Sequence, residues 1–198
     1  MKIILNFSLF SSLCLILCAC PTPDLNTQDL KDLRKNHYDF KNWKRNYYKG
    51  INFDLPKNFE KGNTDFMYKA AGLSKVNYQL GVYISVEQFD ASEADKYSFS
   101  FDEEVTKLTA VHEFYMNERR NSFQYLENSI KTDLPKGSKL PGSMEVIFGR
   151  VDEYDYDMKY VIATVEKNNQ WYVFQFITSQ DLSAYLFDDF KKIIQSIR

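Results

Sequence analysis

Three apolar runs in the last third of the chain decide the fold: MEVIFGRV (residues 144–151), KYVIATVE (159–166) and QWYVFQFIT (170–178). Each run is rich in β-branched and aromatic residues and has the length of a strand. Lys167, Asn168 and Asn169 separate the second run from the third. Asparagine tolerates the positive φ of a tight hairpin turn. We therefore predict three consecutive antiparallel strands.

Two helices are predicted from apolar residues spaced three and four apart. The first covers residues 99–119, where Ser100 and Glu103 make a capping box. Its apolar stripe consists of Val105, Leu108, Val111 (or His112) and Tyr115. The second closes the chain, and its apolar face consists of Leu182, Tyr185, Leu186, Phe190, Ile193, Ile194 and Ile197.

Further strands are predicted upstream. Apolar and polar residues alternate over 51–55, which is typical of a half-buried strand. Residues 64–71 and 76–89 supply the next two strands, whereas 123–130 fits a helix or a strand equally well. Pro141 and Gly142 mark the loop 138–142. One face of the 76–89 strand carries Tyr78, Leu80, Val82, Ile84 and Val86.

The order of strands, helix, strand meander and helix indicates an α+β fold, in which helices cover an antiparallel β-sheet. The segments INFDLP (51–56) and WYVFQF (171–176), with the middle helix and the closing helix 190–197, resemble the PsbP-like superfamily. This resemblance covers roughly residues 47–198. It implies an α/β/α sandwich used mostly as an accessory or protein-binding module, and it supplies no catalytic residue.

The N-terminus has the parts of a secretory signal. Lys2 is the only charge before Asp24, and residues 3–19 are mostly apolar. The segment Leu17-Cys18-Ala19-Cys20 resembles the lipobox of bacterial lipoproteins. The resemblance implies that residues 1–19 are a signal peptide, that cleavage precedes Cys20, and that Cys20 carries lipid. A permanent anchor helix is the alternative, but the stretch is short for a span and prolines follow it.

Lipidation at Cys20 has consequences for chemistry and location. Cys14 and Cys18 would leave with the signal, so the folded part would hold no disulfide, cysteine nucleophile or thiolate metal site. Several acyl chains give stable anchoring. We therefore expect the protein in a bacterial cell envelope. No acidic residue follows Cys20 directly, which favours the outer membrane, on its periplasmic or surface side.

The domain is expected to start after a tether. Residues 20–36 are polar, with a helical turn near 29–34, and residues 37–198 form a single domain. Residues 37–48 (HYDFKNWKRNYY) mix aromatic and basic side chains, a pattern found in nucleic-acid or glycan platforms and at membrane interfaces. The reading we favour is a short helix with Phe40, Trp43 and Tyr47 on one face.

Catalytic signatures are missing from the sequence. The two histidines are His37 and His112, and no G-x-S-x-G, H-E-x-x-H, P-loop or G-x-G-x-x-G motif occurs. We expect His112 to be a partly buried or surface imidazole on a helix, without a catalytic role. The carboxylate groups at 102–104 and 188–189 are expected on the polar faces of helices, too dispersed for glycosidase chemistry.

One acidic cluster could bind a cation. Asp152, Glu153, Asp155 and Asp157 lie within six residues, and Ca²⁺ prefers oxygen ligands. The spacing lacks the glycine and distal glutamate of an EF-hand, so a solvated hairpin tip is the favoured interpretation. Tyrosines beside the cluster would also suit a contact with protein or glycan.

The 198 residues carry a net charge of −2 and a pI near 5.8, so the chain offers no global positive field for nucleic acid. Lys131, Lys136 and Lys139 are too sparse for that role. We expect a non-catalytic envelope lipoprotein without a cofactor, which binds a protein partner as an accessory module of a membrane-associated assembly. The alternative is a binding module for a small ligand, glycan or Ca²⁺; an enzyme is disfavoured.

Overall fold

The computed structural model describes residues 27–37, 42–62, 72–98, 105–150 and 157–198. Its centre is a seven-stranded sheet in the order β3-β4-β5-β9-β8-β7-β6, and every neighbouring pair is antiparallel. The strands are β3 (Glu60–Lys61), β4 (Leu73–Asn77), β5 (Val82–Phe89), β6 (Tyr125–Thr132), β7 (Gly142–Arg150), β8 (Met158–Lys167) and β9 (Gln170–Ser179).

The predicted C-terminal meander is confirmed as β7, β8 and β9. Asn168 and Asn169 form the turn between β8 and β9, with φ of 54° and 56°. Two consecutive residues with positive φ make the turn type whose twist matches the flanking strands. Of the segment 123–130, which fits either type of element, residues 125–130 belong to strand β6.

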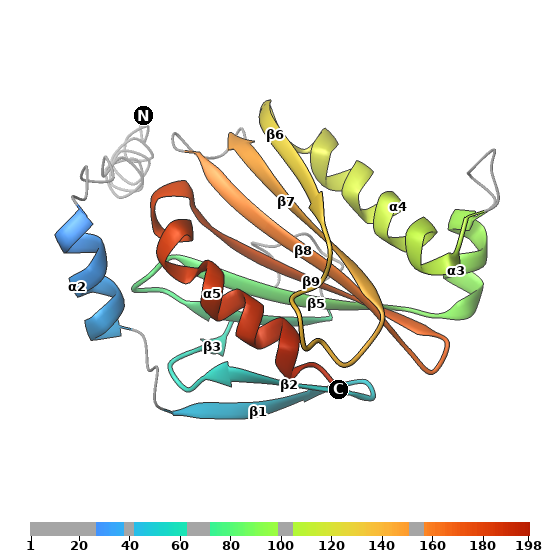
Figure 1. Ribbon diagram of the computed structural model, residues 1–198, viewed down its shortest axis with the longest axis horizontal. Coiled ribbons are helices and arrows are strands. Elements are labelled where there is room, and N and C mark those ends of the chain that lie inside the picture. The colour runs from blue at the N-terminus through green and yellow to red at the C-terminus, as the bar shows by residue number, and fades with distance from the viewer. Residues whose placement is uncertain (1–26, 38–41, 63–71, 99–104, 151–156) are drawn as a thin grey trace, which may run out of the picture.

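Helices cover both faces of the sheet (Figure 1). Helix α5 (Gln180–Ser196) packs on one face, and α3 (Ala91–Ser98) with α4 (Lys107–Asn121) packs on the other. Successive side chains of a strand point to opposite faces, so Phe174 and Phe176 of β9 contact the α5 side while Val173 faces α4. The predicted α/β/α arrangement is confirmed.

A two-stranded sheet of β1 (Trp43–Tyr48) and β2 (Ile51–Pro56) packs beside α5. The predicted strand at 51–55 is therefore confirmed, whereas a helix over 37–48 is wrong for the described residues 43–48. The turn at Lys49 and Gly50, with φ of 41° and 95°, folds β1 back on β2. The backbone of Arg198 exchanges hydrogen bonds of 2.9 and 3.0 Å with Asn52.

Helix α2 (Thr27–His37) precedes this hairpin, and it is longer than the helical turn expected there. It packs against α5, and Leu30 belongs to the main core with 6% of its surface exposed. Leu33 packs against the same core. The described part of the predicted tether therefore lies against the domain.

Two predicted elements have wrong boundaries. Residues 76–89 form a hairpin and not one strand, because Tyr78–Gly81 turn the chain between β4 and β5. Asn77 Oδ1 stabilises that turn by accepting a 3.1 Å hydrogen bond from the amide of Leu80. The middle helix begins at Lys107 and not at 99, with Thr106 as its extended N-cap. The capping box at 100–103 and the strand at 64–71 lie outside the described residues.

Candidate functional site: the polar network beneath helix α4 and the sheet edge it holds

The face of the sheet beneath α4 carries buried polar side chains from four adjacent strands. They occupy positions that alternate with the core residues of the α5 side. Buried polar groups are costly unless they find hydrogen-bond partners, and here α4 supplies them. The four side chains are Glu87 of β5, Gln175 of β9, Thr164 of β8 and Glu145 of β7.

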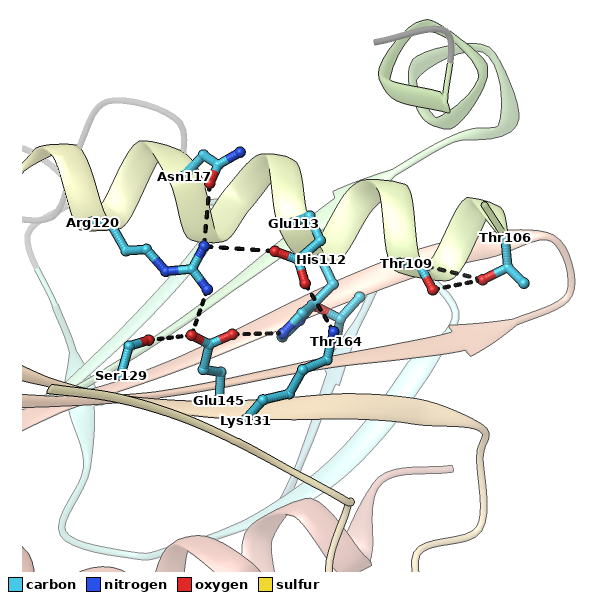
Figure 2. A network of polar contacts seen from close by, with 10 residues as sticks. All are labelled: Thr106, Thr109, His112, Glu113, Asn117, Arg120, Ser129, Lys131, Glu145 and Thr164. Carbon is cyan, nitrogen blue, oxygen red and sulfur yellow. Dashed lines mark hydrogen bonds and ion pairs between the residues drawn. The ribbon is translucent and has the colours of Figure 1, made fainter. Parts of the chain in front are cut away.

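His112 lies at the centre of this layer and is fully buried. Its Nδ1 is 2.9 Å from the hydroxyl of Thr164, and its Nε2 is 3.6 Å from Oε2 of Glu145 (Figure 2). Burial lowers the pKa of His112, although the carboxylates of Glu113 and Glu145 oppose that shift. The imidazole is therefore neutral at pH 7 and holds α4 to strands β7 and β8.

Arg120 connects the buried pair of His112 and Glu145 to the surface (Figure 2). Its guanidinium lies 2.5 Å from Oε1 of Glu145 and 3.6 Å from Oε2 of Glu113. Ser129 donates a hydrogen bond to Glu145, and the ammonium of Lys131 lies 2.8 Å from Glu113. The network thus ends on two residues of strand β6.

Glu113 is ionised within this network. Partial burial raises the pKa of Glu113, but the hydrogen bond and charge of Lys131, with His112 and Arg120, outweigh burial and lower it. The carboxylate can therefore pair with Arg120 and Lys131 at the same time. This pairing fixes the edge strand to helix α4.

A second cluster lies further along the same helix face. The Tyr115 hydroxyl is 3.0 Å from Oε1 of Glu87 and 2.9 Å from Oε1 of Gln175, and it accepts a 2.7 Å hydrogen bond from Arg119. Burial raises the pKa of Glu87 and that of Tyr115. His112, Tyr115 and Arg119 are three and four residues apart, so one helical face supplies all three.

The buried polar groups of this layer hold helix α4 against the sheet. A general acid or base must come within hydrogen-bond reach of a substrate. His112 has no exposed surface and Glu145 is 2% exposed, so both contact the protein's own side chains. His112 lies on a helix as expected, but the expectation of a partly buried or surface side chain is wrong, because Thr164 and Glu145 enclose it.

Strand β6, which the network holds, is the terminal strand of the sheet (Figure 1). It pairs with β7 on one side, and seven of its eight residues are exposed. The register shifts between Leu126 and Asn128, so the regular part of the strand is 128–132. The large exposed apolar side chains of the strand are Tyr125, Leu126 and Ile130, at 64%, 39% and 47%.

The acidic cluster falls mostly outside the described residues, which include only Asp157 of its four members. Asp157 forms a 3.1 Å ion pair with Arg150. Among the described residues, no group of three histidine, cysteine or acidic side chains is placed to hold a metal ion. A Ca²⁺ site at Asp152, Glu153, Asp155 and Asp157 stays a prediction.

The aromatic segment does not form a continuous platform where it is described. Trp43 and Tyr48 pack against the main core, while Tyr47 is 68% exposed. Tyr38 and Phe40 lie outside the described residues. A stacking surface for bases or sugars needs several free rings.

The remaining candidates are dispersed. Asp188 is exposed and pairs with Lys191, as expected for the polar face of a helix, but that expectation is wrong for Asp189, which is buried and pairs with Lys192. Lys131 belongs to the network, and Lys136 and Lys139 are exposed in the loop before β7. Cys20, with the rest of the lipobox, and the carboxylates at 102–104 lie outside the described residues. None of the helices in the described ranges is long and apolar enough to cross a membrane.

The network was not predicted, but the sequence holds a signal for part of it. Glu145 and Gln175 interrupt apolar runs at positions that a buried strand would cover. A polar residue in such a run requires a partner from another element. The sequence does not show that Arg119, Arg120 and Glu87 supply or share those contacts, because the partners are distant along the chain.

Comparisons with known proteins place the fold. No protein-family model matches the chain, and no curated protein is matched by its sequence. Among solved structures, cyanobacterial PsbP (CyanoP) from Synechocystis superposes with a TM-score of 0.53 at 13% identity, over 79% of this chain and 91% of that chain. The domain therefore has a PsbP-like fold, and at this identity the likeness shows the fold alone.

Two other structures are similar over a comparable length. The Ran-binding protein Mog1p of Saccharomyces cerevisiae matches with a TM-score of 0.49 at 9% identity, over 79% of this chain and 95% of that chain. A protein of unknown function from Pseudomonas aeruginosa, PA94, matches with a TM-score of 0.40 at 10% identity, over 78% and 94% of the two chains.

Proposed function

We propose that this chain is a lipid-anchored, non-catalytic protein-binding module whose partner adds a strand to the sheet edge at β6. The observation that carries the proposal is the exposure of this terminal strand together with its apolar side chains Tyr125 and Ile130. The outer edge of a terminal strand presents backbone N–H and C=O groups that another extended chain can pair with.

The polar network supports this use of the edge. Strand addition is favoured when the receiving strand is already ordered, because less conformational entropy is lost on binding. Ser129 and Lys131 tie β6 to Glu145 and Glu113, so the edge is held in an extended conformation before a partner arrives. We place the added strand along residues 128–132, where the register is regular.

Anchoring through Cys20 is the second part of the proposal, and the lipobox resemblance supports it. The test is to express the full chain and its Cys20→Ser variant in a bacterial host with labelled fatty acid. We expect label and membrane association in the first chain only. Acyl labelling and membrane association of Cys20→Ser would overturn this part.

The edge is tested by photo-crosslinking in native membranes. A crosslinking residue at Tyr125 should give one adduct of defined mass, and Ile130→Lys should abolish that adduct because a charge on an edge strand opposes pairing. Tyr78→Lys is the matched control, since the side chain of Tyr78 is exposed as well, at 59%, but lies on the β4–β5 turn. If the adduct disappears with both Ile130→Lys and Tyr78→Lys, or persists with both, the proposed edge is contradicted.

A further inference from the structure

We propose that helix α2 and the β1–β2 hairpin form the face that lies against the anionic phospholipid headgroups of the membrane, an inference that rests on anchoring through Cys20. The first observation is a charge asymmetry along the chain. Residues 27–61 contain nine Lys and Arg against five Asp and Glu, a net charge of +4. Residues 62–198 contain 15 against 21, a net charge of −6.

The basic side chains of this face are accessible. Lys31 and Lys35 are exposed on α2, whose leucines face the core, and Lys49 is exposed on the turn of the hairpin. The acidic Asp54 is already shared between Arg45, at 3.1 Å, and Arg198, at 3.2 Å. Asp29 and Asp32 are exposed on α2 as well, but over α2 and residues 43–56 six Lys and Arg outnumber three Asp, so a net charge of +3 remains for an external anion.

An aromatic side chain stands among these charges. The pairing of Arg45 with Asp54 and of Tyr47 with Asn52 puts these four side chains on one face of the hairpin. The other face of β2 buries Ile51, Phe53 and Leu55 in the core, so this face is the outer one. Tyr47 is 68% exposed there, and tyrosine is enriched at the level of lipid headgroups.

The position of the proposed lipid anchor favours a membrane as the surface that this basic face contacts. Six residues separate Cys20 from Thr27, the first residue of α2. Even a fully extended chain spans at most about 25 Å over that interval. A domain of this size is about 40 Å across. Figure 1 shows α2 at the left and the hairpin at the bottom, both away from α3 and α4 at the upper right, so a short link to Cys20 would keep this side of the molecule near the bilayer.

The charge asymmetry would then orient the domain. Screening limits the attraction to about 8 Å at physiological salt, so only the nearest face is held by the lipid charge. The acidic remainder of the domain is repelled from the same surface. Strand β6 lies on the far side of the sheet from β3, β4 and the hairpin, so this orientation leaves the proposed partner edge accessible (Figure 1).

The test uses the mature lipidated protein in vesicles, with a fluorophore on a single introduced cysteine. Energy transfer to acceptor-labelled headgroups should be strong from Tyr47→Cys and weak from Tyr125→Cys in phosphatidylglycerol-containing vesicles. The difference should disappear in pure phosphatidylcholine and in 0.5 M salt. Equal transfer from both positions in the anionic vesicles, or an unchanged difference in neutral vesicles, would overturn the proposal.

A charge-reversal pair makes the test specific. Lys35→Glu with Lys49→Glu should lose the orientation, whereas Lys96→Glu with Lys107→Glu changes the net charge equally at the α3–α4 end and should keep it. Lys107→Glu removes one exposed ion pair with Asp95, and the loss of such a pair lowers stability only slightly. Identical behaviour of the two double variants would show that total charge, and not this face, governs the contact.

Failure of the anchor is recognised separately by the intact mass of the protein. If the mass shows no lipid, the anchoring proposal fails, and the same protein is sedimented with the two kinds of vesicle. The basic face then predicts retention on anionic vesicles only, weakened at least about 25-fold in Lys35→Glu/Lys49→Glu, since each lost cation contributes about a fivefold factor and the added carboxylates are repelled as well. No retention, or retention independent of this variant, would overturn the face as well.

Discussion

Arg120 and Glu145 join helix α4 to strand β7 where the buried polar network meets solvent, with 2.5 Å between the guanidinium nitrogen and the carboxylate oxygen. The Glu145 side chain is 2% exposed and that of Arg120 is 28% exposed. Because burial keeps His112 neutral, the guanidinium is the nearest positive charge described around this carboxylate. The stability of the α4 layer should therefore depend on Arg120.

Arg120→Met should lower the free energy of unfolding by about 3 kcal/mol, because it leaves a buried carboxylate without its countercharge. Urea denaturation monitored by circular dichroism measures the change. Arg150→Met is the matched control: its ion pair with Asp157 is about half exposed and should contribute less than about 1 kcal/mol. Adding Glu145→Gln to Arg120→Met should recover part of the loss; equal losses in the two arginine variants would contradict this account.

Stability should fall as the pH drops below the ordinary pKa of histidine. The folded pKa of His112 is lowered by burial, so the unfolded chain binds the proton more readily and the folded state is disfavoured below about pH 6.5. A single proton limits the slope to about 1.4 kcal/mol per pH unit. Burial raises the pKa of Glu87, and this group has the opposite effect on stability: just above pH 4.5 it makes the folded state more stable as the pH falls.

His112→Gln isolates this effect, because glutamine can still hydrogen-bond Thr164 but does not titrate. The variant should be less stable at pH 7, and its loss of stability between pH 7 and 5.5 should be smaller than that of the parent chain. Thermal melts across this range provide the measurement. Parallel pH profiles for the two proteins would show that another group titrates.

Helix α2 should contribute to the stability of the domain. Leu30→Ala should cost about 2–3 kcal/mol, because it removes a buried side chain from the main core. Lys31→Ala, at the next and exposed position, should change stability by less than about 0.5 kcal/mol. Chemical denaturation compares the two. If Leu30→Ala leaves stability unchanged, α2 does not form part of the folded unit.

Substitutions in the β8–β9 turn should change stability according to the backbone conformation that the new residue allows. Asn169 has φ of 56°, which glycine adopts freely and β-branched residues disfavour. Asn169→Gly should be neutral within about 0.5 kcal/mol, whereas Asn169→Val should cost about 1–2 kcal/mol. Thermal unfolding of the two variants provides the comparison, and similar midpoints would count against a positive-φ turn.

The predictions from sequence succeeded where local pattern and tertiary structure agree. The β7–β9 meander has long apolar runs and a clear turn between β8 and β9, and helix α5 has strong periodicity, with its predicted apolar face buried except for the half-buried Tyr185. Strand β1 shows the opposite case. Trp43 and Tyr47 have the spacing of a helical stripe, but the positive φ at Lys49 and Gly50 and the pairing with β2 determine a strand.

Two other differences have identifiable causes. Helix α3 escaped detection because it is short, although Asp90 and Glu93 hydrogen-bond each other's backbone amides as a capping box does. The polar network could be only half predicted: Gln175 and Glu145 stand out within apolar runs, but their contacts with Tyr115 and Arg120 bridge distant parts of the chain. Periodicity reports which face is buried and does not report the pairing of polar groups across it.

The irregular register between Leu126 and Asn128 also bears on aggregation. A long, regular terminal strand is a template on which identical sheets can stack edge to edge into fibres. This register shift interrupts the ladder, so continuous pairing is limited to about five residues, and Glu127 at the shift adds a charge. With the lipid anchor proposed above, copies crowded in the plane of a bilayer would meet each other often, and the register shift would oppose their pairing through this edge.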